Sequence, residues 1–291
     1  MNFKKNPYRP QLEALWGKLS NVNGVLFLIV NQIENYEKQQ ESLWKKKDIK
    51  VPRFMGAVLS ITDLTGPTHE GWPYNYPIGG LLVKGHEFAK MKEEIIRRIS
   101  CFSVAQGYEA FETFLKDTTA RYLHRNQGIA DVNDVQDFEK QCCRSNKSDV
   151  KYWTAFVRFA RKTYGGKDND KLFGFLRKVT PELEVAENKN NRDMDLTKWY
   201  KAASVARHAI THSRLEIPED SWRYLDKNDK IYFPCKNVGH RHFLALERKN
   251  AENCLSMFAE YGFLIFKCLS KQDSYKWNIV KGMRTETDLV I

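Results

Sequence analysis

A long run of apolar residues at helical spacing dominates this chain of 291 residues. Between residues 87 and 124, apolar side chains recur every three or four positions, which is the spacing of one face of an α-helix. A helix this long can bury its apolar stripe only against other elements, and other helices are the simplest partners. We therefore expect an all-α fold built around one long helix, with Gly107 as the point where that helix is weakest.

Shorter runs with the same periodicity follow, so the expected architecture is an up-and-down helical bundle. Gly165 and Pro181 end two of these runs, and Asp193 or Asp195 is the candidate N-cap of the third. A polar stretch at residues 187–192 separates the second run from the third. Strand-like residues on both sides of an Asn-Val-Gly turn predict a short β-hairpin at residues 230–246. The expected helices cover residues 150–164, 172–179, 196–210 and 251–268.

Three parts of the chain differ in pattern. Residues 1–85 are an N-terminal extension, in which residues 12–19 and 25–44 can form helices and residues 51–83 form a non-helical excursion rich in Gly, Pro and aromatic residues. Residues 86–270 are the helical domain, and residues 271–291 are a C-terminal tail of mixed composition. Trp72, Tyr74 and Tyr76 in the excursion either stack on unpaired bases or form a small core of the loop itself.

The charge of the chain favours a polyanionic partner. Lys and Arg number 47 and Asp and Glu 36, which gives a formal charge of +11. Residues 1–150 contribute 21 − 18 = +3 and residues 151–291 contribute 26 − 18 = +8, so the excess lies in the second half. Nucleic acid fits such a surface, although a basic surface without a ligand is the alternative. No apolar run approaches the roughly 20 residues of a membrane span, so we expect a cytoplasmic protein with no membrane partner.

Several kinds of chemistry lack their motifs. The sequence contains neither GxxxxGK[ST] nor GxGxxG, and neither HExxH nor GxSxG, which argues against nucleotide triphosphatases, dinucleotide enzymes, zinc proteases and α/β-hydrolases. His240 and His242, with Cys235 five residues before the first, form the one metal-like cluster, but the spacing of a four-ligand zinc site is absent. The six cysteines form no CxxC pair, so we expect reduced thiols.

The sharpest candidate site is the segment Arg207-His208-Ala-Ile-Thr211-His212 near the end of the third run. A helical wheel places both histidines on the face turned away from the helix's own apolar stripe, about 40° apart. Arg207 lies on the flank of that face, beside Thr211. A solvated helix end, with cationic groups favourably placed near the helix C-terminus, is the alternative interpretation.

This set of side chains suits cleavage of RNA by its own 2′-hydroxyl. The reaction needs a base for the 2′-hydroxyl proton, an acid for the departing 5′-oxygen, and a cation near the extra charge on phosphorus. Imidazole can act as base or acid near neutral pH, and arginine grips phosphate oxygens with a permanently charged fork. No metal or other cofactor is required.

The segment RHAITH resembles the motif of the HEPN family, in which an arginine is followed by a polar residue, three further residues and a histidine. Members of this family are metal-independent ribonucleases of toxin–antitoxin, CRISPR and anti-phage abortive-infection systems. The resemblance extends over residues 86–270, with a long helix before the motif and a closing helix after it. It implies a homodimer in which the motif helices of two copies face one another across a cleft that binds RNA.

The resemblance also implies roles for individual residues. Arg207 stabilises the phosphate charge, His212 is the main acid/base residue, and His208 occupies the polar position of the motif. Glu109 or Glu112 on the long helix steadies the motif, unless both lie on an ordinary solvated face. Some HEPN toxins carry a Tyr two residues after the His for control by a partner, but this chain has Arg214 there. Arg214 and Thr211 are then assigned to substrate binding, and an antitoxin or sensor is a further expected partner.

Two other functions remain open at this point. A HEPN-like module can bind RNA or a protein partner without cutting, using the same basic face. A zinc-assisted hydrolase can use His240 and His242.

Overall fold

A computed structural model describes most of the chain and forms two compact units. One unit comprises Met1–Leu26 with Ile99–Ile291, and the other comprises Phe27–Arg98. The described part is mostly helical and contains a small three-stranded antiparallel sheet. The first 26 residues therefore group with the helical unit, whereas the sequence pattern placed them in an extension ending at residue 85. The described residues are 6–47, 53–54, 61–62, 74–75, 82–83, 85–141, 146–164, 169–224 and 232–278.

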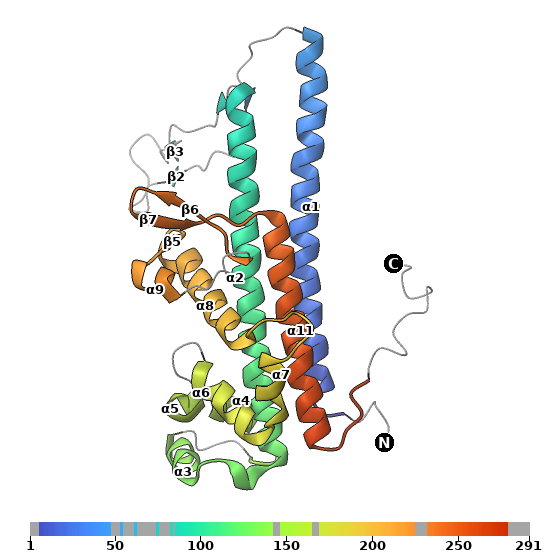
Figure 1. The fold of residues 1–291 in the computed structure, drawn as a ribbon, viewed down its shortest axis with the longest axis vertical. Helices are drawn as coiled ribbons and strands as arrows, with labels where there is room; N and C mark the ends of the chain where they lie inside the picture. The colour runs from blue at the N-terminus through green and yellow to red at the C-terminus, as the bar shows by residue number, and fades with distance from the viewer. Residues whose placement is uncertain are drawn as a thin grey trace. The chain divides into compact units, whose positions relative to one another are not determined.

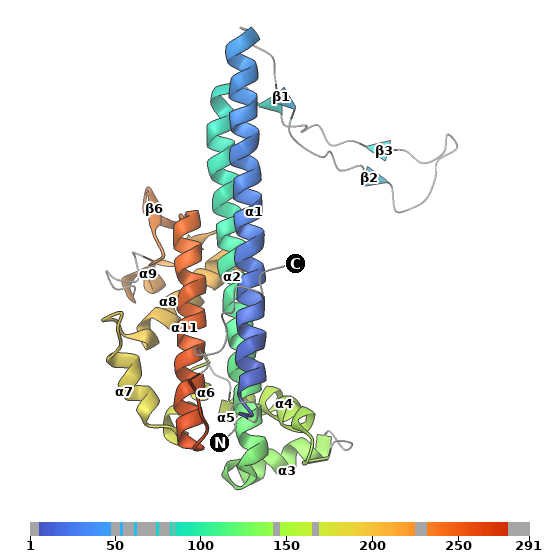
Figure 2. The same cartoon turned by 90° about the vertical axis from the view of Figure 1, so that its right-hand side faces the viewer.

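Three long helices form the centre of the first unit: α1 (Arg9–Lys47), α2 (Gly85–Arg125) and α11 (Arg248–Gln272). The parts of these helices that belong to the first unit run side by side in both views (Figures 1 and 2). The predicted long helix is confirmed by α2, and α1 is one helix where two were expected. Gly107 does not interrupt α2. A Cβ at this position would lie 2.6 Å from the Leu255 side chain, so the glycine allows α11 to approach α2 closely.

A group of short helices follows α2, and its aromatic side chains form a local core. The predicted helix at residues 150–164 is divided at Ala160, whose ψ of 52° leaves the helical region, and the predicted stop at Gly165 lies outside the described residues. The predicted linker at residues 187–192 was partly wrong, because its first two residues belong to α7. These helices are α3 (Val132–Gln141), α4 (Val150–Phe159), α5 (Arg161–Tyr164), α6 (Asp170–Val179) and α7 (Glu182–Asn188).

Helix α8 (Leu196–His212) begins at a side-chain cap, as the sequence predicted. The carboxylate of Asp195 accepts hydrogen bonds from the backbone N–H groups of Thr197 (2.9 Å) and Lys198 (3.0 Å), which satisfies two donors that a helix start leaves open. Its apolar face, which includes Trp199 and Ala203, is buried. The opposite face stays exposed, and this decides where the candidate site lies.

A small antiparallel sheet follows α8 in the order β5-β7-β6. Strands β6 (Cys235–Val238) and β7 (Arg241–Leu244) form the predicted hairpin. The turn is Gly239-His240, two residues later than expected, and Gly239 has a φ of 61°, which glycine adopts without strain. Strand β5 (Glu216–Ile217) pairs with β7, and α9 (Glu219–Tyr224) follows; neither was predicted.

The second unit holds parts of α1 and α2 and four short strands. Lys92 of α2 forms an ion pair of 2.6 Å with Glu37 of α1. The predicted non-helical excursion lies largely outside the described residues, as do Trp72 and Tyr76, while Tyr74 lies in β3. Strand β1 (Arg53–Phe54) pairs with β4 (Leu82–Val83), and β2 (Ile61–Thr62) pairs with β3 (Tyr74–Asn75).

Two further findings concern the whole described chain. No helix among the described residues is both long and apolar enough to cross a membrane. Cys101, Cys235, Cys254 and Cys268 are free thiols, and the adjacent pair at positions 142 and 143 lies outside the described residues. The expected tail at residues 271–291 is described only to residue 278, and its first two residues belong to α11.

Candidate functional site

The last turns of α8 carry two exposed histidines side by side. His208 and His212 are both exposed, and their ring centroids lie 5.1 Å apart with the ring planes tilted by 46°. The i, i+4 spacing on a helix brings these rings together, and the buried alanines at 206 and 209 turn them outward. The structure confirms the predicted face of both histidines. Two imidazoles, a group that can act as acid or base, thus stand side by side on the exposed face of α8.

Arg207 lies beside this pair, and its side chain makes one loose contact within the described residues. Its side chain is 31% exposed, and its Nη2 atom lies 3.6 Å from Oε1 of Glu109. That distance is short enough for an ion pair but too long for a hydrogen bond. The Nε atom is buried and has no acceptor among the described residues. A partly exposed guanidinium without a fork-shaped partner can bind an anion through its Nη groups.

The two candidate supporting carboxylates have different partners. Glu109 of α2 reaches Arg207, whereas Glu112 forms a 2.9 Å ion pair with Lys116 one turn later on its own helix. The structure therefore brings Glu109 to the motif and leaves the half-buried Glu112 paired along its own helix. Glu109 is thus the one of the two predicted supporting carboxylates that lies within ion-pair distance of Arg207.

Thr211 and Arg214 occupy the edge of the site. The Thr211 hydroxyl donates a 2.9 Å hydrogen bond to the carbonyl oxygen of Arg207, so it stabilises the last turn of α8. Arg214 and Leu215 have positive φ values of 51° and 72°, an unusual conformation for two consecutive non-glycine residues. The Ala209 carbonyl accepts from the N–H groups of Ser213 and Leu215, which fixes this turn. Arg214 is consequently exposed directly beyond the histidine pair.

The other histidine cluster has a structural environment. The His242 ring stacks on Trp222 at 4.2 Å, and its two nitrogens contact Asn237 Oδ1 (2.8 Å) and Glu219 Oε2 (3.2 Å). His240 lies exposed on the hairpin turn. Among the described residues, no group of three His, Cys, Asp or Glu side chains is placed to hold a metal ion. Because both nitrogens of His242 already have partners, the zinc-assisted interpretation loses its main ligand.

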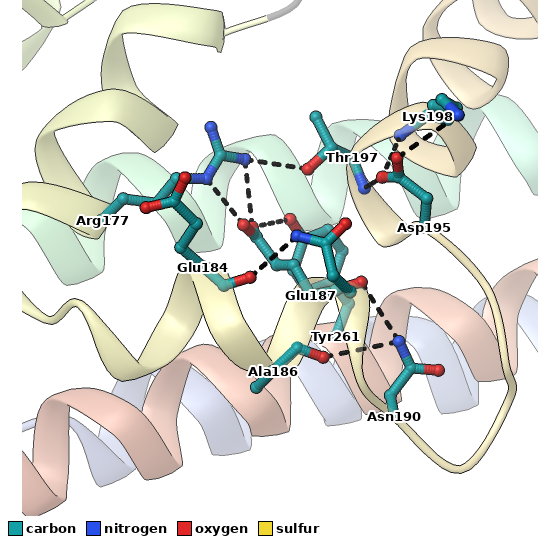
Figure 3. A network of polar contacts seen from close by, with 10 residues as sticks. Arg177, Glu184, Ala186, Glu187, Asn190, Asp195, Thr197, Lys198 and Tyr261 are labelled. Carbon is teal, nitrogen blue, oxygen red and sulfur yellow. Dashed lines mark hydrogen bonds and ion pairs between the residues drawn. The ribbon is translucent and has the colours of Figure 1, made fainter.

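A buried polar network near the start of α8 was missed by the sequence analysis. Figure 3 shows Arg177 of α6, Glu187 of α7 and Tyr261 of α11 pointing toward one another. Arg177 donates to Glu187 from Nε (2.6 Å) and Nη2 (3.1 Å), and Nη2 also donates to Thr197 Oγ1 at 3.1 Å. The Tyr261 hydroxyl donates to Glu187, whose side chain is 1% exposed. This network connects four helices.

The surroundings of the network change the acidity of its members. Burial, together with the negative charge of Glu187, holds the pKa of Tyr261 well above its ordinary value. Burial alone would lower the pKa of Arg177, but the hydrogen bonds and charge of Glu187 outweigh that effect and raise it. Tyr261 and Arg177 thus both keep their protons at neutral pH. The one available signal in the sequence was Glu187 four residues after the buried Leu183, a spacing that places both side chains on one face of a short helix.

Comparison with known proteins adds no relative. The chain matches no family model, no curated protein and no solved structure. The chemistry of the site therefore rests on its own geometry: an under-bonded guanidinium and two outward-facing imidazoles at the exposed end of α8.

Proposed function

We propose that this protein is a metal-independent endoribonuclease of the HEPN type, acting as a homodimer. The observation that carries this proposal is Arg207, a partly exposed arginine with only a loose 3.6 Å ion pair to Glu109 among the described residues, next to a pair of exposed histidines. A phosphodiester supplies the paired oxygens that the guanidinium lacks. The resemblance of the RHAITH segment to the HEPN motif adds anti-phage defence or a toxin–antitoxin system as the setting.

Each side chain has a defined part in the proposed reaction. The 2′-oxygen attacks the adjacent phosphorus while a base removes its proton, and the bond from phosphorus to the 5′-oxygen breaks as an acid protonates that oxygen. The products are a 2′,3′-cyclic phosphate and a 5′-hydroxyl. His212 is the main acid/base group, His208 orients the RNA or shares the proton transfer, and Arg207 stabilises the charge on the phosphate oxygens. No cofactor enters the reaction.

The second copy supplies the missing half of the reaction. One histidine cannot accept and donate a proton at opposite sides of one phosphorus, so His212 of each protomer serves one side. Phe102 of α2 offers a contact for this pairing, because it is 60% exposed and lies two turns before Glu109 on the same face of the helix. A large aromatic side chain of this kind can serve as the buried anchor of an interface.

Purified protein and a single-stranded RNA in EDTA test the proposal. The wild type is expected to cut the RNA, and Arg207→Ala or His212→Ala is expected to lower the rate by about 10²-fold to 10⁴-fold, the size of one lost acid/base or charge-stabilising group. His240→Ala, at an exposed histidine on the hairpin turn, is the matched control and should cut normally. RNA bound but not cut by the wild type would contradict the enzyme and favour a binding module.

A further inference from the structure

The exposed face of α8 is basic along its whole length. Its 17 residues include Lys198, Lys201, Arg207, His208 and His212 and no Asp or Glu. Taking about 100° per residue, Lys201, His208 and His212 fall within about 40° of one another, opposite the buried face that contains Trp199 and Ala203. All three are exposed. They form a stripe, which we call the α8 stripe, that ends in the proposed catalytic pair.

The lysines of α8 are weakly neutralised. Within the described part of the chain, Lys201 has no ion-pair partner, and Lys198 has a single one, Asp195 at 3.7 Å, which is also the N-cap of the helix. Some exposed cations elsewhere on the described surface do pair with a carboxylate three or four residues away, as Lys140 does with Asp137. A helix that keeps its cations and carries no acid of its own leaves their charge for an external anion.

We propose that the α8 stripe binds the RNA backbone away from the cut, with Lys201 contacting a flanking phosphate. This inference rests on the proposed function, because it extends the same site. A helix rises about 1.5 Å per residue, so Lys201 lies about 10 Å from His208 and about 16 Å from His212 along the axis. A stacked strand carries a phosphate about every 3.4 Å, so the stripe spans about three to five phosphates. Lys201 is a substrate-binding residue and takes no part in proton transfer.

Salt-dependent binding isolates this contact from catalysis. The probe is a 20-nucleotide single-stranded RNA with 2′-O-methyl groups, which has no free 2′-hydroxyl to attack phosphorus and stays intact. Each phosphate contact on a single strand contributes about 0.7 to the slope of log affinity against log salt. Lys201→Ala is therefore expected to lower that slope by about 0.7. Between 1 M and 0.1 M salt, the affinity of the variant should then rise about five-fold less than the affinity of the wild type. Lys151→Ala, at an exposed lysine on α4, is the control and should leave the slope unchanged.

Other outcomes distinguish the stripe from the nuclease. Equal slopes for wild type, Lys201→Ala and Lys151→Ala would overturn the stripe, and so would absence of binding by the wild type at low salt. If polyglutamate of equal charge competes as effectively as RNA does, the α8 stripe is not an RNA site, and an acidic protein partner is favoured instead. A reduced slope for Lys201→Ala, in a protein that leaves unmodified RNA uncut, would support the stripe and contradict the proposed ribonuclease.

Discussion

Two arginines near opposite ends of α8 have opposite environments. Arg177 meets the start of the helix with a fork-shaped pair of hydrogen bonds to buried Glu187 and a third to Thr197. Arg207 near the end of the helix makes one loose ion pair, 3.6 Å from Glu109, and its Nε has no acceptor among the described residues. The hydrogen bonds of Arg177 thus connect three helices. Arg207 has no fork-shaped partner among the described residues, and this difference is why we place the proposed anion site at the end of α8.

The largest effects are expected from two variants, one of which loses stability and the other activity. Glu187→Ala removes the partner of Arg177 and Tyr261 at once, so the free energy of unfolding should fall by about 3 to 5 kcal/mol. Arg207→Ala should change it by less than about 0.5 kcal/mol while RNA cleavage is lost. Denaturant titration of both variants measures this.

Glu260→Ala is the matched control for Glu187. It removes an exposed carboxylate whose two oxygens face Arg192, a pair of the kind that contributes about 1 kcal/mol or less. A loss for Glu187→Ala no larger than for Glu260→Ala would mean that the buried network does not hold the helices.

The interface prediction comes next in size. Phe102→Glu places a charge on an exposed apolar position of α2. The dissociation constant of the dimer should therefore rise at least about ten-fold, which corresponds to about 1.4 kcal/mol. Sedimentation equilibrium measures the dissociation constant. Val25→Glu, at a 55% exposed apolar position on α1, is the control. Identical dissociation constants for the two variants would remove Phe102 from the interface.

Glu109→Gln tests how loosely Arg207 is held. Removing the carboxylate charge takes away the one anion that contacts Arg207 within the described residues, so RNA should bind about two-fold to five-fold more tightly, a change within the range of an exposed pair. Filter binding with the 2′-O-methyl RNA measures this. If affinity falls instead, Glu109 positions the guanidinium and does not compete with the phosphate.

The smallest expected effect concerns Asp117 of α2. Burial raises the pKa of this carboxyl, although Arg158, Lys18 and Lys116 partly oppose the shift. A raised folded-state pKa means that the folded protein gains stability as the pH falls through that value and loses it as the pH rises. Asp117→Asn should therefore raise the melting temperature slightly at pH 7 and leave it unchanged near pH 3. An equal increase at both pH values would assign the effect to packing.

The sequence was informative where periodicity and capping decide the structure. The long α2, the Asp195 cap and the outward face of His208 and His212 all follow from helical spacing and local chemistry. These features depend on residues within one element, so a single segment contains the necessary information.

Features that depend on several elements were not predictable. The sequence pattern of α2 predicts that Gly107 weakens the helix. In the fold, the close approach of Leu255 on α11 is what requires a glycine there. Glu187 reads as part of a polar linker, and only Arg177 and Tyr261 from two other helices make it a buried residue. Likewise, nothing in the sequence distinguishes Glu109 from Glu112, because the approach of α8 to α2 decides which carboxylate reaches Arg207.

The ends of the RNA products test the central claim most directly. RNA incubated with the wild type in excess EDTA, then analysed by mass spectrometry, should carry 2′,3′-cyclic phosphate and 5′-hydroxyl ends. That result is expected if His212 transfers protons and Arg207 stabilises the phosphate without a metal. Products with 5′-phosphate and 3′-hydroxyl ends, or cleavage abolished by EDTA and restored by a divalent cation, would contradict the role assigned to the exposed end of α8.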